Sequence, residues 1–394
     1  MRRAPGGEYE NPDPNRPGLA TEALLMQIAQ QAGVPEPEIY RVLTPEDDLG
    51  AGFVMAWLDG ETLGSRILKS PELDDIRPTL ARECGQVLAR IHGIDPVTSG
   101  LSRRLTTVTT QDFVETLWAQ YKSYNTPQPM IDYTARWLLA HIPPEGEARL
   151  VHNDFRNGNL MVTPNGINAV LDWEVAHLGD PVRDIGWICT NSWRFGNTEM
   201  RVGGFGHLAD LLAGYEAESG IRIDATHVHF WEVFGSFWWA VGCLKMAHHW
   251  RNGPDRTVER PAVARRSSEC QADCVNLLIP GDVEMVEETQ VQSSLDTPSV
   301  DELLLSVRDF LREDVRAATA GRDNFMALVA SNSLDIVRRE QRLAAQCLQA
   351  ETDRLRRLLS SDGDVMALRW QLTHALRDDE LALDCPELTA HLRN

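Results

Sequence analysis

Lysine is nearly absent from this 394-residue chain. Only Lys69, Lys122 and Lys245 stand among 38 basic residues, so arginine supplies almost all of the positive charge. Positive charge is scarce overall, because 58 acidic residues leave a formal net charge of −20 at pH 7. Proteins that bind a nucleic-acid backbone or an anionic membrane need clustered cations. The composition therefore argues against nucleic acid and against a membrane surface as partners.

Long apolar runs and paired cysteines are also lacking. No stretch reaches the roughly 18 consecutive apolar residues of a membrane-spanning helix, and the N-terminus carries no apolar leader segment. The seven cysteines are odd in number and scattered, which is typical of reduced thiols. We expect a cytoplasmic protein. Its length predicts two or three domains of ordinary globular composition.

The most informative stretch is a predicted β-hairpin. Two short apolar runs, 160–162 and 169–171, flank the turn residues Pro164-Asn165-Gly166. Polar residues gather at the open end of this hairpin, namely His152, Asp154, Asn159 and Asp172. The first three form the pattern His-Asn-Asp-x-x-x-x-Asn, and Asp172 follows the second strand. One alternative is an acidic hairpin whose Asp and Asn residues merely cap loops.

The same spacing suits phosphoryl transfer from ATP. This reaction requires the protein to hold Mg²⁺ against the phosphates and to orient the attacking hydroxyl. Asn159 and Asp172 supply the amide and carboxylate oxygens that bind Mg²⁺. Asp154 is then the candidate that accepts or steers the proton of the substrate hydroxyl. We include His152 in the catalytic set, where we expect it to brace the loop by hydrogen bonding.

This block resembles the catalytic and metal loops of the aminoglycoside phosphotransferase (choline-kinase-like) family, relatives of protein kinases. Leu171-Asp172-Trp173-Glu174 stands where protein kinases have Asp-Phe-Gly. The longer string 172–187, with 192–196 and 202–206, is similar to the branch of kinase-like domains fused to acyl-CoA dehydrogenases. That branch is associated with phosphorylating hydroxy acids or their CoA esters.

The resemblance implies an α+β, protein-kinase-like two-lobe fold. The small N-terminal β lobe is expected to be truncated and the large lobe mainly helical, followed by an all-α C-terminal domain. We predict a partial N-lobe at 1–60, a C-lobe with the catalytic and metal loops at 61–280, a linker at 281–300 and a helical accessory domain at 301–394. The accessory domain resembles an uncharacterised helical domain that accompanies these proteins.

The resemblance also implies contacts with ATP near the start of the chain. Arg2, with Arg3 as second choice, stands where the family has a basic residue that meets the phosphates. Glu22, in a predicted helix at 21–32, stands where the family has the carboxylate partner of that cation. Alternatively, a glutamate early in a helix simply favours the positive end of the helix dipole.

The apolar strand 53–58 resembles the hinge between kinase lobes. Backbone groups of Ala56 and Leu58 are then expected to contact the adenine ring, although a plain buried strand explains the pattern as well. The family's phosphate-covering loop is not found before Arg2. Gly6-Gly7, which follow Arg2, are not expected to replace that loop. A non-catalytic kinase-like binding or regulatory module is therefore an alternative function.

The phosphoryl acceptor is predicted to be a hydroxyl of a small molecule. Trp193 and Arg194 are the candidates that border it, with Arg194 as a clamp for an acidic acceptor or a CoA phosphate. The alternative for Arg194 is stacking on neighbouring aromatic rings, and the alternative acceptor is an aminoglycoside or another amino alcohol. The family resemblance implies that Asp184 braces the backbone of the catalytic loop. Arginine-rich helix faces in the tail, such as 338–339 and 354–357, are expected to be solvated. The minority alternative is binding to the kinase part or to another copy of the chain, as in a homodimer.

Overall fold

The computed structural model describes residues 1–4, 16–287 and 296–394. They form two compact units: the first comprises Met1–Glu115 and Leu138–Ser236, and the second comprises Thr116–Trp137 and Phe237–Asn394. Gly6-Gly7 and the middle of the predicted linker lie outside the described residues. The four-part division along the chain stays a prediction. Among the described residues, no helix is long and apolar enough to cross a membrane.

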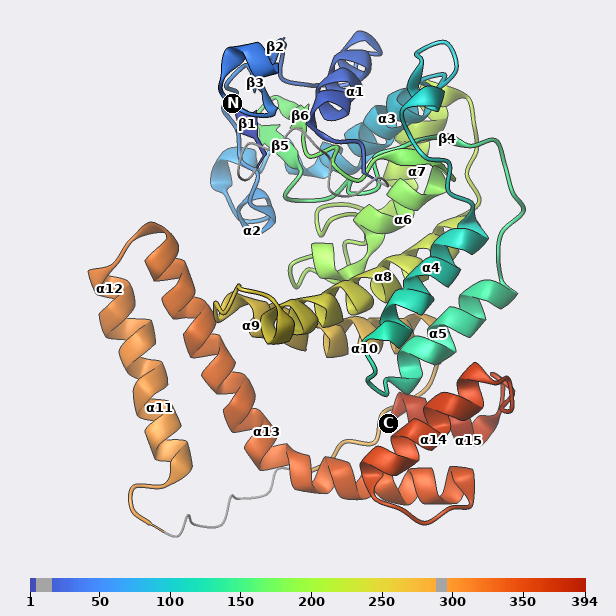
Figure 1. The fold of residues 1–394 in the computed structure, drawn as a ribbon, viewed down its shortest axis with the longest axis vertical. Helices are drawn as coiled ribbons and strands as arrows, with labels where there is room; N and C mark the ends of the chain where they lie inside the picture. The colour runs from blue at the N-terminus through green and yellow to red at the C-terminus, as the bar shows by residue number, and fades with distance from the viewer. Residues whose placement is uncertain (5–15, 288–295) are drawn as a thin grey trace. The chain divides into compact units, whose positions relative to one another are not determined.

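The first unit combines short strands with helices (Figure 1). Its elements are β1 (Arg2–Arg3), α1 (Leu19–Gln31), β2 (Ile39–Val42), β3 (Gly52–Met55), α2 (Gly64–Ile67), α3 (Leu80–His92), β4 (Arg149–Val151), β5 (Leu160–Thr163), β6 (Gly166–Val170), β7 (His177–Gly179), α6 (Val182–Cys189) and α7 (Leu208–Ser219). Two helices, α4 (Thr110–Ser123) and α8 (Ala225–Asn252), begin in this unit and end in the second.

The strands form three small antiparallel sheets. The first has the order β1-β3-β2, with Arg2 opposite Phe53, and α1 packs against β2 and β3. The second pairs β4 with β7, and the third pairs β5 with β6, with Leu160 opposite Val170. The predicted hairpin is therefore confirmed, and β4 and β5 bracket the loop that carries Asp154.

Helices α3 and α7 approach each other unusually closely. The apolar residues of α3 recur at helical spacing and are buried, namely Leu80, Cys84, Val87, Leu88 and Ile91. A Cβ atom on Gly85 would collide with the carbonyl of Leu211, and one on Gly214 would collide with the carbonyl of Arg82. Glycine at both positions permits this backbone contact. The packing buries His92, the last residue of α3.

The second unit is helical in its described residues. Besides the ends of α4 and α8, it contains α5 (Pro129–Ala140), α9 (Glu259–Arg265), α10 (Ser267–Leu278), α11 (Val300–Phe310), a π-helical turn (Leu311–Val315), α12 (Arg316–Ala318), α13 (Gly321–Leu359), α14 (Val365–Arg377) and α15 (Pro386–Arg393). All but the last three residues of α5 belong to it.

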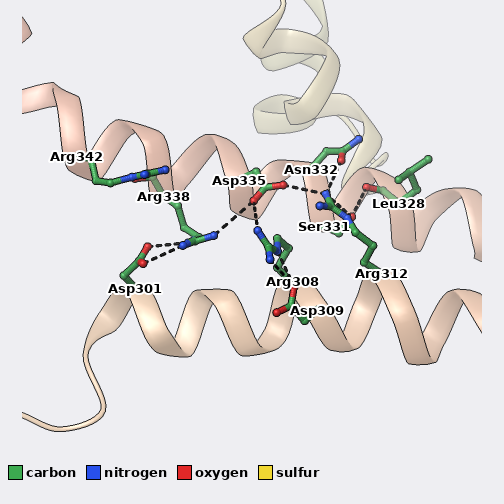
Figure 2. Close-up of polar contacts among 10 residues, drawn as sticks. All are labelled: Asp301, Arg308, Asp309, Arg312, Leu328, Ser331, Asn332, Asp335, Arg338 and Arg342. Atoms are coloured by element: carbon green, nitrogen blue, oxygen red, sulfur yellow. Dashed lines mark hydrogen bonds and ion pairs between the residues drawn. The ribbon is translucent and has the colours of Figure 1, made fainter. Parts of the chain in front are cut away.

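A ladder of charged side chains joins α11 to the first half of α13 (Figure 2). Arg338 donates two hydrogen bonds to Asp301, at 2.7 and 2.9 Å. Asp335 accepts from Arg308 at 3.1 Å and from Arg312 at 2.9 Å. Only 13% of the Arg338 side chain is exposed. The prediction that Arg338 lies on a solvated face is therefore wrong, because its partner on α11 is 37 residues away in the sequence.

The tail helix α14 is joined to α5 through a buried carboxylate. Asp132 is fully buried and accepts hydrogen bonds from Arg377, Trp118 and Tyr121 at 2.8 to 2.9 Å. Burial raises the pKa of Asp132, while the hydrogen bonds from Arg377 and Trp118 oppose that change. The carboxylate thus ties the end of α14 to α4 and α5 within the second unit.

We expect Asp132→Ala to destabilise this part of the second unit by about 3–5 kcal/mol, because it leaves the charge of Arg377 without its partner. Hydrogen exchange of the α14 amides measures the change. Glu269→Ala is the control, since Glu269 is 62% exposed and pairs with Arg266 on the surface, where such pairs contribute about 0–1 kcal/mol. Equal protection of α14 in the two variants would contradict the role given to Asp132.

Candidate active site

The loop between β4 and β5 holds Asp154 by both carboxylate oxygens. Oδ1 accepts hydrogen bonds from Trp187 Nε1 at 2.8 Å and from Arg156 Nε at 2.9 Å. Oδ2 accepts from Asn159 Nδ2 at 2.6 Å. These donors come from α6 and from the loop itself. Asp154 is therefore held in one orientation at the open end of the hairpin.

Asp172 follows β6 at the same end of the hairpin. Its φ of 71° lies in the left-handed region, which is uncommon for residues other than glycine. The N–H of Leu171 donates to the carbonyl of Asn159 at 2.8 Å, so the two loops are joined next to their polar side chains. The structure thus brings together the strand ends that carry Asp154, Asn159 and Asp172.

The donor set at this end fits Mg²⁺. The carboxylate of Asp172 and the amide oxygen of Asn159 are hard oxygen ligands, which Mg²⁺ prefers. Among the described residues, no group of three or more His, Cys, Asp or Glu side chains could hold a metal ion. The pair formed by Asp172 and Asn159 suits an ion that completes its coordination with waters and phosphate oxygens, as Mg²⁺ does in nucleotide sites.

Arg2 lies among three carboxylates. Its Nε is 3.1 Å from Glu22 Oε2, and its Nη2 is 2.8 Å from Asp172 Oδ1 and 3.4 Å from Glu174 Oε2. Burial raises the pKa of Glu22 to about 7; the charge of Arg2 lowers it, and those of Asp172 and Glu174 raise it. Arg3 is exposed. The geometry therefore favours Arg2 over Arg3 as the cation of the site.

Asp184, in the first turn of α6, braces the backbone of the catalytic loop. Its Oδ2 accepts from the N–H of His152 at 2.8 Å, and its Oδ1 accepts from the N–H of Asn153 at 2.7 Å. Nε2 of His92 lies 3.1 Å from Oδ2, and the hydroxyl of Tyr215 lies 3.1 Å from His92 Nδ1. Burial by itself would raise the pKa of Asp184, but hydrogen bonding and charge from His92 outweigh it and hold that pKa below its ordinary value.

His152 joins the catalytic loop to the loop that carries Asp172. Its buried ring lies with Nε2 3.1 Å from the carbonyl of Leu171, and its Nδ1 accepts from the N–H of Asp154 at 3.2 Å. Burial lowers the pKa of His152, so the ring is neutral at pH 7. These are contacts through which His152 could brace the loop, and the role itself stays a prediction.

The two residues predicted to border the acceptor have different surroundings. The ring of Trp193 lies beneath Arg156, with 4.3 Å from the guanidinium carbon to the ring centroid. Trp193 is thus connected to Asp154 through Arg156.

Arg194 is engaged elsewhere. Its Nε and Nη2 donate to the carbonyl of Cys189 at 3.1 and 2.7 Å. Its Nη1 donates to the carbonyl of Thr198 at 2.9 Å. Its Nη2 also donates to the carboxylate of Glu232 at 2.5 Å. Glu232 is buried and pairs with Arg201 as well. The structure does not support the clamp predicted for Arg194, because every guanidinium nitrogen already donates within the protein.

Arg156 is one of the residues that the sequence interpretation missed. It lies two positions after Asp154, and its Nη1 donates to the carbonyl of Asn157 at 2.8 Å. Its place inside the catalytic loop was the available signal.

Glu36 was also missed, and no local motif marks it. Its Oε1 accepts a hydrogen bond from Trp173 Nε1 at 3.0 Å and so holds the residue after Asp172.

The predicted adenine contacts lie directly after β3. The N–H of Ala56 donates to the carbonyl of Glu38 at 2.8 Å, so an adenine contact at this residue would use its carbonyl. Leu58 lies three residues before Glu61, which exchanges two backbone hydrogen bonds with Val162 of β5. The adenine contact at Leu58 stays a prediction.

Comparisons with known proteins agree with this geometry. A model of the phosphotransferase enzyme family matches residues 10–221, more than half of the chain. A model of a domain of unknown function (DUF6285) matches residues 317–394. The crystal structure of a Ralstonia eutropha protein classed with the aminoglycoside phosphotransferases is 25% identical, with a TM-score of 0.55 over 65% of this chain and 82% of that chain. The predicted α+β kinase-like fold is confirmed.

Two curated relatives contain a similar region. They are acyl-CoA dehydrogenase family member 10 of Mus musculus, 30% identical over 199 residues, and member 11 of Gallus gallus, 30% identical over 239 residues. The alignments cover 48% and 56% of this chain but 18% and 28% of those relatives. The chain therefore spans less than a third of their length.

We expect Asp184→Asn to lower stability by about 3–5 kcal/mol, because it disrupts a buried charged network, and to flatten the dependence of stability on pH. Since the pKa of Asp184 is depressed in the folded state, its contribution is complete above the unfolded-state pKa of about 3.9 and is lost as pH falls through the folded-state pKa. Thermal unfolding midpoints between about pH 7 and pH 3 measure the effect. Parallel curves for the two proteins would contradict it.

Proposed function

The chain belongs to the phosphotransferase enzyme family, and from this premise we propose that it transfers the terminal phosphoryl group of Mg·ATP to a hydroxyl of a small molecule. The observation that supports this proposal most is the meeting of Asp154, Asn159 and Asp172 at one end of the β5–β6 hairpin, with Arg2 bonded to Asp172. Phosphoryl transfer depends mainly on positioning and charge stabilisation. The site offers both.

In the proposed reaction, Asn159 and Asp172 would hold Mg²⁺, which when bound would neutralise the charge that develops on the phosphates. Arg2 contacts the phosphates. Because Arg2 is now bonded to Asp172, the binding of Mg·ATP requires it to exchange this carboxylate for a phosphate oxygen. Glu22 holds Arg2 through Nε at 3.1 Å, and its contact with Nη2 is longer, at 3.5 Å, so Nη2 can make that exchange.

Asp154 receives the proton of the acceptor. The acceptor oxygen forms a bond with the terminal phosphorus, the bond from that phosphorus to the bridging oxygen of ADP breaks, and the hydroxyl proton passes to the Asp154 carboxylate. Trp187, Arg156 and Asn159 keep the carboxylate in place for this transfer. His152 and Asp184 position the loop and do not exchange protons with the acceptor.

The acceptor is inferred to be a hydroxy acid or its CoA ester. Arg156 lies directly beside Asp154 and is partly exposed, so an acceptor with a carboxylate or phosphate group would meet a cation next to the base. The curated relatives carry the name of an acyl-CoA dehydrogenase family, which agrees with an acyl-CoA type of acceptor. A polycationic aminoglycoside would meet Arg156 with like charge.

Substitution of Asp154 and of Asp172 tests the proposed reaction. Asp154→Asn is expected to lower kcat on the order of 10²-fold or more, because the proton acceptor is lost.

Mg·ATP is expected to raise the thermal midpoint of the wild type in a saturable manner, and Asp172→Ala and Arg2→Gln are expected to abolish that shift. Asp75→Ala, at an exposed position, is the control. Near-full turnover by Asp154→Asn would remove the assigned base. A wild-type thermal midpoint that Mg·ATP does not raise would favour a non-catalytic module.

Substitution of Arg156 tests the acceptor. We expect Arg156→Gln to raise KM for 3-hydroxybutyrate or 3-hydroxybutyryl-CoA by about tenfold or more, since a charge-assisted contact is lost, while KM for ATP changes little. ADP release measures both constants, and Arg66→Gln, on the exposed surface, is the control. ADP release with kanamycin, but with neither hydroxy acid nor CoA ester, would instead favour an amino-alcohol acceptor.

A further inference from the structure

A cavity lies wholly within the second unit. Its volume is about 750 Å³, and its walls come from α5, from α8 to α10 and from the tail helices α13 to α15. Cavities of this size hold small organic ligands. Asp154, Asp172 and Arg2 belong to the first unit, so the cavity is separate from the proposed catalytic residues.

The lining of this cavity is positively charged. It contains the arginines Arg251, Arg265, Arg354 and Arg369 and the glutamates Glu284 and Glu351, so its ionic side chains have a formal charge of +2. The whole chain has a formal charge of −20. A local excess of arginine in so acidic a protein favours an anionic ligand.

The four arginines differ in their partners. Arg369 is held by both oxygens of Glu351 at 2.5 Å, and Arg265 pairs with Glu340, which lies outside the lining, at 2.8 Å. By contrast, the buried Nε of Arg354 has no hydrogen-bond partner among the described residues. Arg251 lines the cavity and is exposed. Because a buried N–H group without an acceptor is costly, the Nε of Arg354 indicates a ligand that supplies the missing acceptor.

His391 provides a second, independent sign of a ligand. Its side chain lines the cavity with the residue only 8% exposed, and its buried Nδ1 has no hydrogen-bond partner in the described part of the chain. Burial, and then the nearby charge of Arg354, lower the pKa of His391 to about 4, so the ring is neutral at pH 7. A neutral ring next to Arg354 can donate one hydrogen bond to an anion without a further desolvated charge.

We propose that this cavity binds a phosphorylated small molecule, with the phosphate between Arg354, Arg251 and His391. A phosphate monoester carries about −1.5 to −2 charges at pH 7, which matches the charge of the lining. Arginine binds phosphate through paired hydrogen bonds. Met130 and Leu392 supply apolar wall for the organic part of the ligand. The site is independent of the chemistry proposed for the first unit.

Glycerol 3-phosphate and inorganic phosphate are the probes for this site, titrated calorimetrically at constant ionic strength. The full-length wild type is expected to bind glycerol 3-phosphate saturably. Arg354→Gln and Arg251→Gln are each expected to raise its Kd by about tenfold or more, a loss of about 1.4 kcal/mol per tenfold. Arg251 is exposed, so its variant is expected to fold even if Arg354→Gln does not.

Two controls separate this site from others. Arg357→Gln changes an exposed arginine three residues from Arg354 on the same helix, outside the cavity, and Arg2→Gln changes the first unit. Both are expected to keep the wild-type Kd. Four outcomes would each overturn the proposal. The wild type could fail to bind glycerol 3-phosphate saturably, or the Kd could stay unchanged in Arg251→Gln. The Kd could rise with Arg2→Gln instead, or the wild type could bind succinate equally well.

Discussion

The buried carboxylate of Asp184 is the interaction on which the catalytic loop depends. A carboxylate removed from water requires donors on both oxygens, and two of the donors here are the backbone N–H groups of His152 and Asn153. The loop cannot shift without leaving that charge unpaired. A third donor, His92, ends α3, and the close approach of α3 to α7 at Gly85 restricts its position. The packing of two core helices therefore helps to position the catalytic loop.

Charges in the candidate active site are paired within the protein. Asp154 accepts hydrogen bonds from three side chains, and Arg2 is surrounded by three carboxylates. This pairing avoids the cost of unpaired, partly buried charges. It also means that a cofactor must compete with existing contacts, above all that between Arg2 and Asp172. The buried Glu22 is the partner that can hold Arg2 while that contact is exchanged.

The second unit uses arginine in two different ways. In the α11–α13 ladder and at Asp132, each guanidinium group meets a carboxylate within the protein, and the helices are held together by these pairs. Around the cavity, Arg354 has a buried nitrogen without such a partner among the described residues. The first pattern is expected of a structural role. The second is expected where a ligand completes the pairing, and the proposed ligand would contact both the tail helices and α8.

Local patterns of the sequence were sufficient for the hairpin and for the spacing of Asp154 and Asn159 along the loop, because turn chemistry and apolar periodicity act over a few neighbouring residues. The kinase-like fold class came from the resemblance of these loops to a known family. The partners of charged side chains were decided by the tertiary structure. Arg194 meets Glu232, 38 residues away, and Arg338 meets Asp301, 37 residues away. Nothing within a few residues of an arginine says which distant carboxylate or carbonyl packing will bring to it, since a long, flexible side chain pairs with whichever group the fold places in reach.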